Sequence, residues 1–370
     1  MQEHALAERL ITYDTCTLEG IQSAAGFVKG WLESRDVDVS VGSHNGLPVI
    51  AATVGAHAAA DAPTVVFHGH IDVVPGRPEQ FVPRIDGDRL FGRGAYDMKG
   101  GLASMMVAAR DLSEQDAVRV HLVVVSDEES DEATQRGSDY LVEQGYTGDF
   151  AITGEPTDLH IGVQAKGVLA MRIEVSGKSA HGSTPWLGDN AVLKALDVFR
   201  QIESMPFSRE SSEFFDRPSI SLGRIIGGDV INKVPDLCVM DVDVRYLPGQ
   251  EPDSILEGVR AIPDVHVAKV FTRAPAIVER SNPYVQMLAS AVAEGTPAER
   301  ISVGRDGASD AISFIEAGVP AVEFGPEGAG HHGPEEWVSI PSLSRYRAAL
   351  VEFVRLIAEQ QLPTKHLRIA

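Results

Sequence analysis

The sequence predicts an α/β protein in which a larger domain, built on a mixed sheet flanked by helices, is interrupted by a smaller α+β domain. Three observations support this prediction. At 370 residues, the chain is longer than a single hydrophobic core usually supports. Short apolar runs alternate with helical patterns near both ends, as in the buried strands of α/β sheets. Strands in the middle alternate apolar residues with polar or small ones, which is typical of a sheet with one covered face.

The composition narrows the classes of protein to which this chain could belong. Its apolar fraction of 44% and charged fraction of 23% are those of a soluble globular protein. The formal charge of -21 argues against nucleic acid or an anionic membrane surface as a partner. Two cysteines do not suggest a disulfide framework. The N-terminal stretch carries Glu3 and Glu8 and has no continuous apolar core, so we expect a cytoplasmic protein without a secretory signal.

Helix and strand patterns alternate through the first part of the chain. Apolar residues at helical spacing predict helices, and short β-branched runs predict strands. The predicted helices span residues 3–12, 18–34 and 98–112, and the predicted strands span residues 37–41, 47–54, 65–67, 120–125 and 150–153. The tripeptide Asp86-Gly87-Asp88 predicts a hairpin turn.

The middle of the chain predicts a β-α-β-β-α-β order, which suits a two-layer α+β module. Its strands are expected near residues 168–176, 220–226, 237–246 and 265–271, and its helices near 190–202 and 252–262. Helix–strand alternation then returns, with predicted helices at 282–294, 309–317 and 342–360 and strands at 301–303 and 321–324. We therefore expect one domain from residues 1–167 and 281–370, and an inserted domain from residues 168–280.

Imidazole and carboxylate groups follow three of the predicted buried strands. The run TVVFHGHID ends on two histidines and an aspartate, the next strand leads into SDEE, and a third leads into GEP. Ligands bind at the carboxyl ends of strands in open α/β sheets, so these groups are expected to converge. The candidate metal ligands are His70, Asp97, Glu129, Glu155 and one histidine of the pair His331 and His332.

This set of donors favours two divalent metal ions that share one carboxylate. Imidazole and carboxylate suit zinc, with cobalt or manganese as alternatives, and the lack of thiolates argues against a structural zinc site. Two histidines and three carboxylates suffice for two ions about 3.5–4 Å apart if one carboxylate bridges them. Asp97, which precedes the predicted helix 98–112, is the best candidate for the bridge. Its alternative role is to cap that helix.

Two further acidic residues, Glu128 and Asp72, lie beside the predicted ligands. Glu128 and Glu129 are neighbours, so in an extended segment their side chains point to opposite sides. One can bind metal while the other faces the attacking water as a general base. Asp72 lies two residues after His70 and could accept the second N–H of that imidazole, which would fix its tautomer.

These residues lie in motifs that resemble one known enzyme family. HGHIDVVP, GRGAYDMKGG, SDEES, TGEPT, SGKSAHGSTPWLGDNA, DVRYLPG and HHGPEEW are similar to motifs of the family that holds acetylornithine deacetylase, succinyl-diaminopimelate desuccinylase, aminoacylase and glutamate-type carboxypeptidases. The resemblance covers nearly the whole chain, in the same order. It is specific to the family but not to any one member.

The resemblance implies a role for each candidate. One zinc would be held by His70, Asp97 and Glu155, and the other by Asp97, Glu129 and His332. Glu128 is the implied general base, and Asp72 the aspartate that supports His70. The inserted domain is implied to be a lid that mediates dimerisation, so the expected protein is a homodimer.

Three residues of the inserted domain also match family positions. His181 is implied to reach the partner subunit's site and to help stabilise the oxyanion, although a lone loop histidine is more often solvated or capping. Asn232, in INKVP, matches the asparagine of the lid. Arg245 could clamp a carboxylate of the substrate, or it could form an ion pair on its own sheet.

The predicted activity is metal-dependent hydrolysis of an amide bond. The preferred substrate is an N-acyl amino acid, acetylated or succinylated, and the alternative is a dipeptide or another peptide cleaved by a dipeptidase or carboxypeptidase. A non-catalytic binding protein on the same fold is the third hypothesis. Loss of Glu128 or of a metal ligand would be its signature, and none of these residues is missing.

Overall fold

The computed structural model describes residues 2–55, 57–130, 135–292, 297–301, 303–307 and 309–360. The chain divides into two compact units. The first contains residues 1–163, 278–303 and 310–370, and the second contains residues 164–277 and 304–309. No described helix has the length and apolar character needed to cross a membrane.

The first unit is built on a mixed sheet, as predicted. Its strands follow the order β1-β2-β6-β3-β7-β15, and the sheet continues into β8. β3 is parallel to β6 and β7, β15 is parallel to β7, and β2 is antiparallel to both β1 and β6. The bounds are β1 Asp38–His44, β2 Leu47–Val54, β3 Thr64–His70, β6 Arg119–Val125, β7 Phe150–Thr153, β8 Gly162–Ala165 and β15 Ala321–Glu323. β13 (Ala276–Ile277) and β14 (Val303–Arg305) both pair with β8.

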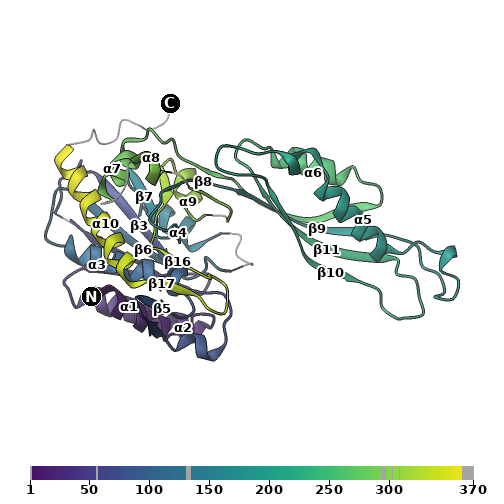
Figure 1. Ribbon diagram of the computed structural model, residues 1–370, viewed down its shortest axis with the longest axis horizontal. Coiled ribbons are helices and arrows are strands. Elements are labelled where there is room, and N and C mark those ends of the chain that lie inside the picture. The colour runs from purple at the N-terminus through teal and green to yellow at the C-terminus, as the bar shows by residue number, and fades with distance from the viewer. Residues whose placement is uncertain are drawn as a thin grey trace. The chain divides into compact units, whose positions relative to one another are not determined.

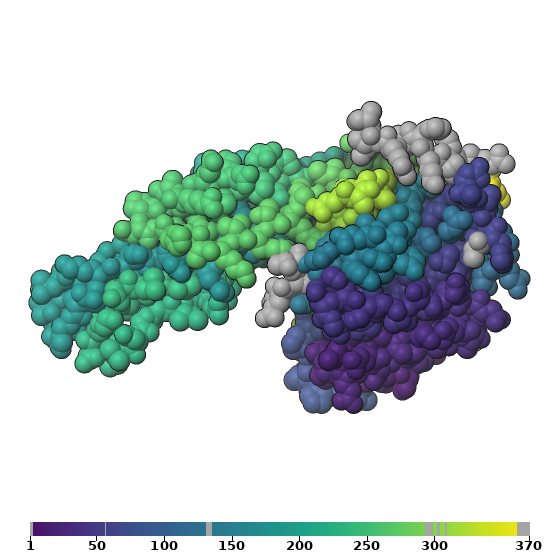
Figure 2. Space-filling model, turned by 180° about the vertical axis from the view of Figure 1, so that it is seen from behind, coloured from purple at the N-terminus to yellow at the C-terminus, as the bar shows by residue number. Residues whose placement is uncertain are grey.

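Helices cover this sheet in two groups, and β3, β6 and β7 lie between them in Figure 1. One group is α1 (Gln2–Ile11), α3 (Gly100–Asp111), α7 (Pro283–Ala291) and α10 (Ile340–Gln360), in which α10 packs on α3 and α7 and α3 packs on α1. The other group is α4 (Gly137–Glu143) and α9 (Ala311–Glu316), which lie side by side in Figure 2 as blue-green and yellow-green surfaces. α2 (Leu18–Glu33) packs on β1 and β2, and α8 (Pro297–Arg300) packs on α7.

A small antiparallel sheet positions the late histidines. Its order is β16-β17-β5-β4, with bounds β4 Arg84–Asp86, β5 Arg89–Phe91, β16 Gly328–Ala329 and β17 Trp337–Ser339. The predicted hairpin turn at residues 86–88 is confirmed, because β4 and β5 pair around Gly87, whose φ is +60°. The segment that connects β16 to β17 carries His331 and His332.

The second unit has the predicted β-α-β-β-α-β order. Its elements are β9 (Gly167–Ser176), α5 (Ala191–Glu203), β10 (Ser219–Gly227), β11 (Leu237–Tyr246), α6 (Pro252–Arg260) and β12 (Val265–Arg273). The sheet order is β10-β11-β9-β12. On β11 every second residue is buried, among them Met240, Val242 and Val244, which pack with the apolar faces of both helices. The alternation in the sequence therefore marks the covered face of this sheet.

Some elements differ from their predicted bounds. Helix α3 begins at Gly100 rather than at residue 98, because residues Ala95–Lys99 form a separate kinked turn, η2, that contains a cis Asp97–Met98 peptide bond. Short 3-10 turns lie at Pro78–Phe81, Pro185–Leu187 and Pro206–Arg209. The predicted helix 282–294 appears as α7, which ends at Ala291, and residues 293–294 lie outside the described residues. Residue 302 of the predicted strand 301–303 also lies outside them.

His121 on β6 gives this fold a pH dependence. Burial, together with the positive charge of Arg119, lowers the pKa of His121 to about 4, whereas a histidine in an unfolded chain has a pKa of about 6.5. Between these values the unfolded state binds more protons, so the free energy of unfolding decreases as the pH falls through this window. Between about pH 6.5 and pH 4, the urea concentration at the unfolding midpoint should therefore decrease less in His121→Gln than in the wild-type protein.

The exposed His57 provides the control for this prediction. His57→Gln should keep the wild-type dependence of the urea midpoint on pH. An unchanged slope in His121→Gln would show that the acid sensitivity of the fold arises elsewhere.

Candidate metal centre

Parallel strand pairing brings the candidate ligands to one edge of the main sheet. His70 is the last residue of β3 and lies opposite Val125, the last residue of β6. β7 pairs with the other side of β3 and ends just before Gly154. Residues 128–129, after β6, and Glu155, after β7, are therefore delivered beside His70. The convergence follows from the topology, since carboxyl ends of parallel strands share an edge.

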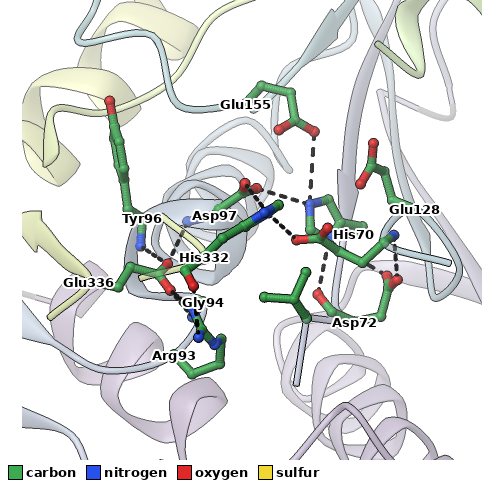
Figure 3. A network of polar contacts seen from close by, with 12 residues as sticks. His70, Asp72, Arg93, Gly94, Tyr96, Asp97, Glu128, Glu155, His332 and Glu336 are labelled. Atoms are coloured by element: carbon green, nitrogen blue, oxygen red, sulfur yellow. Dashed lines mark hydrogen bonds and ion pairs between the residues drawn. The ribbon is translucent and has the colours of Figure 1, made fainter. Parts of the chain in front are cut away.

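Asp97 lies between two histidines and faces each with a different oxygen. Its Oδ1 is 3.3 Å from Nε2 of His70, and its Oδ2 is 3.5 Å from Nε2 of His332. Nε2 of His332 is also 3.0 Å from Oε1 of Glu129, and Nε2 of His70 is 3.9 Å from Oε1 of Glu155. Figure 3 shows this arrangement, with the Asp97 carboxylate close to the imidazoles of both His70 and His332. Asp97 does not cap α3, whose N-cap is Lys99, so its alternative role as a helix cap is wrong.

The donor atoms have the spacing that metal ions require. Atoms bound to a tetrahedral zinc at about 2.0–2.1 Å lie roughly 3.3 Å from one another. Two groups of donors within 4.8 Å share Asp97, namely His70–Asp97–Glu155 and Asp97–Glu129–His332. Oε1 of Glu155 is buried without a hydrogen-bond partner, as expected for an atom whose partner is a cation. The residues present therefore fit bound divalent metal.

The charges of the cluster compensate one another strongly. Burial lowers the pKa of His70, but the carboxylates of Asp72, Asp97 and Glu155 outweigh burial and hold that pKa well above its ordinary value. Hydrogen bonds to Asp97 and Glu129 raise the pKa of His332 to about 10. Burial raises the pKa of Asp97, but the two histidines overcome it and hold that pKa far below its usual range. Metal ions must displace the two imidazole protons, so metal affinity should fall with falling pH.

Glu128 and Glu129 occupy different surroundings. Glu129 contacts His332, whereas the carboxyl group of Glu128 lies near His70. Burial and the neighbouring carboxylates of Asp310, Glu129 and Asp97 raise the pKa of Glu128 well above its ordinary value, although His70 opposes them. Nη1 of Arg136 donates a 2.7 Å hydrogen bond to the backbone carbonyl of Glu128 and so fixes this segment. A carboxyl group with a raised pKa can accept and return a proton near neutral pH.

Asp72 contacts His70 with both its backbone carbonyl and its carboxylate. Nδ1 of His70 donates to the backbone carbonyl of Asp72 at 3.0 Å, while the Asp72 carboxylate lies 3.5 Å away. Oδ2 of that carboxylate accepts the backbone N–H of Glu129 at 2.8 Å. Asp72 therefore connects the His70 strand end to the Glu129 segment. His68 points elsewhere, since its Nε2 lies 2.9 Å from Oγ of Ser138 in α4.

The sequence analysis missed a buried ion pair beside the site. Glu336 and Arg93 are 2% and 3% exposed, and Nη1 of Arg93 donates to Oε2 of Glu336 at 2.8 Å. Backbone N–H groups of the Asp97 turn also donate to Glu336 (Figure 3). The motif HHGPEEW carries two adjacent glutamates, but the sequence holds no signal that distinguishes the buried Glu336 from the exposed Glu335.

The remaining predicted residues belong to the second unit. Nδ1 of His181 lies 2.7 Å from Oγ of Ser183, and the loops of His181 and Asn232 are joined because the Gly182 N–H donates to the Asn232 carbonyl at 2.7 Å. Arg245 on β11 forms an ion pair with Asp243 at 2.9 Å. The donors of the metal cluster all come from the first unit.

A cluster of imidazoles and carboxylates at the carboxyl edge of an α/β sheet is the arrangement that metal-dependent hydrolases use. Residues 66–356 match peptidase family M20/M25/M40, and the chain belongs to this family. It is therefore an enzyme of the peptidase and amidohydrolase class that the sequence motifs indicated.

Similar proteins share the family but differ in the activity named for them. A succinyl-diaminopimelate desuccinylase of Gluconacetobacter diazotrophicus is 30% identical over 302 residues, which cover 76% of this chain and 78% of that protein. A probable carboxypeptidase of Emericella nidulans is 30% identical over 289 residues, covering 70% of this chain and 68% of that protein. The solved structure of a Staphylococcus aureus tripeptidase aligns with a TM-score of 0.78 at 19% identity, covering 97% of this chain and 98% of its own.

Proposed function

We propose that this protein hydrolyses the amide bond of an N-acyl amino acid with two divalent metal ions, zinc in the first place and cobalt or manganese as alternatives. The observation that carries the proposal is the position of Asp97, whose two oxygens face two different histidines at 3.3 and 3.5 Å. A carboxylate placed in this way can bridge two ions, as in co-catalytic hydrolases. Metal ions bound there would acidify a water molecule and polarise the scissile carbonyl.

The side chains of the first unit then have separate tasks. Glu128 takes a proton from the attacking water and returns it to the leaving amine, which its raised pKa allows. His70, Asp97, Glu129, Glu155 and His332 hold the ions. Asp72 keeps His70 and Glu129 in register through its backbone carbonyl and its carboxylate.

The second unit supplies groups that recognise the substrate. His181 is exposed, as its proposed role of stabilising the oxyanion in the partner subunit's site requires, and Asn232 in the adjoining loop offers an amide. We assign Arg245 to a substrate carboxylate. That role requires its guanidinium to exchange or share its ion pair with Asp243, and at 31% side-chain exposure the group is accessible.

The deacylase and the peptidase differ in the acyl group on the amide nitrogen that is released. The desuccinylase among the relatives supports a deacylase, and the carboxypeptidase supports the alternative of a peptidase. The test is a panel of acetylornithine, succinyl-diaminopimelate and several dipeptides, run on dialysed enzyme with zinc, cobalt or manganese added back. Highest kcat/KM on an N-acyl amino acid supports the proposal. Exclusive turnover of peptides would replace it with the alternative, and no turnover of either class would overturn both.

We further propose that the protein is a homodimer that associates through its second unit. β10 is an edge strand of its sheet and exposes Ile225 and Ile226 at 37% and 58%. The adjacent helix α5 exposes Leu193 and Leu196 at 61% and 38%. An apolar edge of this kind favours pairing with another copy of the chain.

Replacing Ile226 by lysine should dissociate the dimer. The lysine would place a charge within the apolar edge of β10, where association would have to desolvate it. Sedimentation velocity should give a dimer for the wild-type protein and a monomer for Ile226→Lys. A monomeric wild-type protein, or a variant that remains dimeric, would contradict this interface. Ile85→Lys, on the exposed edge of β4 in the first unit, serves as the control.

A further inference from the structure

A single buried carboxylate collects hydrogen bonds from the turn that carries Asp97. Oε1 of Glu336 accepts the backbone N–H groups of Tyr96 and Asp97, both at 3.0 Å. Oε2 accepts the N–H of Gly94 at 3.0 Å and Nη1 of Arg93 at 2.8 Å. Each oxygen of Glu336 therefore accepts two hydrogen bonds, and the backbone of Asp97, the candidate bridging residue, is hydrogen-bonded directly to this carboxylate (Figure 3).

Arg93 extends the same network to the other side of the metal centre. Its Nη2 donates to the backbone carbonyl of His332 at 3.3 Å and to that of Pro75 at 3.4 Å, five residues after His70. His332 itself has a φ of +62°, a left-handed conformation that needs support in a residue with a side chain. The ion pair thus joins the turn of Asp97, the segment of His332 and the chain after β3, although these segments lie far apart in the sequence.

We propose that Glu336, with Arg93, is a positioning residue that holds Asp97 and His332 at the distance needed to share metal ions. Buried charges are costly unless they are paired and hydrogen-bonded, and here every oxygen of Glu336 serves the geometry of the metal ligands. Glu336 acts through the backbone of other residues, as do the groups that orient metal ligands in other proteins. This inference rests on the proposed metal centre.

Glu336→Gln is the sharpest test, because it preserves the shape of the side chain. A glutamine has only one accepting oxygen, and its other terminal group is a hydrogen-bond donor, NH₂. In either orientation of the amide, this NH₂ group would face N–H groups that now donate to an oxygen of Glu336. The expected result is a 10- to 100-fold weaker affinity for zinc, roughly the effect of losing an outer-shell partner of a metal ligand. The affinity is measured by titrating zinc into chelator-treated, dialysed protein.

The thermal midpoint separates positioning from a purely structural role. Zinc should raise the midpoint of the wild-type protein, because a ligand that binds only the folded state stabilises it. In Glu336→Gln this rise should shrink, whatever the midpoint of the metal-free variant. Glu335→Gln, at the neighbouring glutamate with 74% side-chain exposure, should bind zinc like the wild type.

Each outcome supports or overturns the inference. Wild-type zinc affinity and a wild-type rise in midpoint for Glu336→Gln would overturn it while leaving the metal centre intact. A wild-type protein that binds no zinc, cobalt or manganese would instead refute the proposed function itself. If Glu336→Gln does not fold, Arg93→Lys takes its place, since lysine keeps the charge but lacks the planar fork with which Arg93 donates to Glu336 and to the His332 carbonyl through separate nitrogens. Zinc binding by that variant as tight as in the wild type would overturn the inference.

Discussion

Glu128→Gln should lower kcat by about 10²–10⁴-fold, the contribution typical of a general base, and leave metal binding intact. The carboxyl group lies beside His70 within the cluster, and its burial raises its pKa well above the ordinary value. Glutamine keeps the size of the side chain but cannot take a proton from water. The measurement is kcat and KM on the best substrate of the panel, with the metal content of the same preparation.

The neighbouring Glu129→Gln provides the contrast for this experiment. Glu129 contacts His332 at 3.0 Å and is assigned as a metal ligand, so this change should reduce the amount of bound metal. If Glu128→Gln loses turnover but keeps its metal, Glu128 acts as a base. If Glu129→Gln loses metal, Glu129 acts as a ligand. Near-normal kcat in Glu128→Gln would show that another group takes the proton.

Asp97→Asn should have the largest effect on the metal centre as a whole. The aspartate carries one negative charge and offers an oxygen to each side of the site, at 3.3 Å from His70 and 3.5 Å from His332. The asparagine offers a single oxygen and turns an NH₂ group toward the other ion. We expect the metal content to fall below that of the wild type and kcat/KM to decrease by about 10³-fold or more, because both ions depend on the bridge.

Asp86→Asn is the matched control, because Asp86 is 76% exposed and its contact is with Arg84. It should keep the wild-type metal content and kcat/KM. Metal content is measured by mass spectrometry after removal of free ions. If Asp97→Asn retained a full complement of metal and its turnover, Asp97 could not be the shared ligand.

The long strands and the convergence of the candidate metal ligands can be predicted from the local pattern of apolar and polar residues in the sequence. Apolar residues dominate β3, β6 and β7 because both faces of the central sheet are covered, and imidazole or acidic groups stand at or just after the end of each strand. On β11 the alternation reflects one covered face, so the order of elements in the second unit could also be read from the sequence. Parallel pairing then places the strand ends together without further information.

Other features depend on contacts that no local pattern encodes. Strands such as β16 and β17 contain two and three residues, too few for a period to be visible. α3 begins at Gly100 because residues 95–99 turn separately, and a Cβ on Gly101 would lie 2.6 Å from the carbonyl oxygen of Gly154. The ion pair of Glu336 with Arg93 spans 243 residues, and only the folded chain shows that it supports Asp97.

Crystals of the zinc-loaded protein, measured at the zinc absorption edge, test the central claim most directly. We expect two anomalous peaks separated by about 3.5–4 Å. One should lie against His70, Asp97 and Glu155, and the other against Asp97, Glu129 and His332. A single peak, or two peaks that do not share Asp97, would contradict the bridged pair of metal ions.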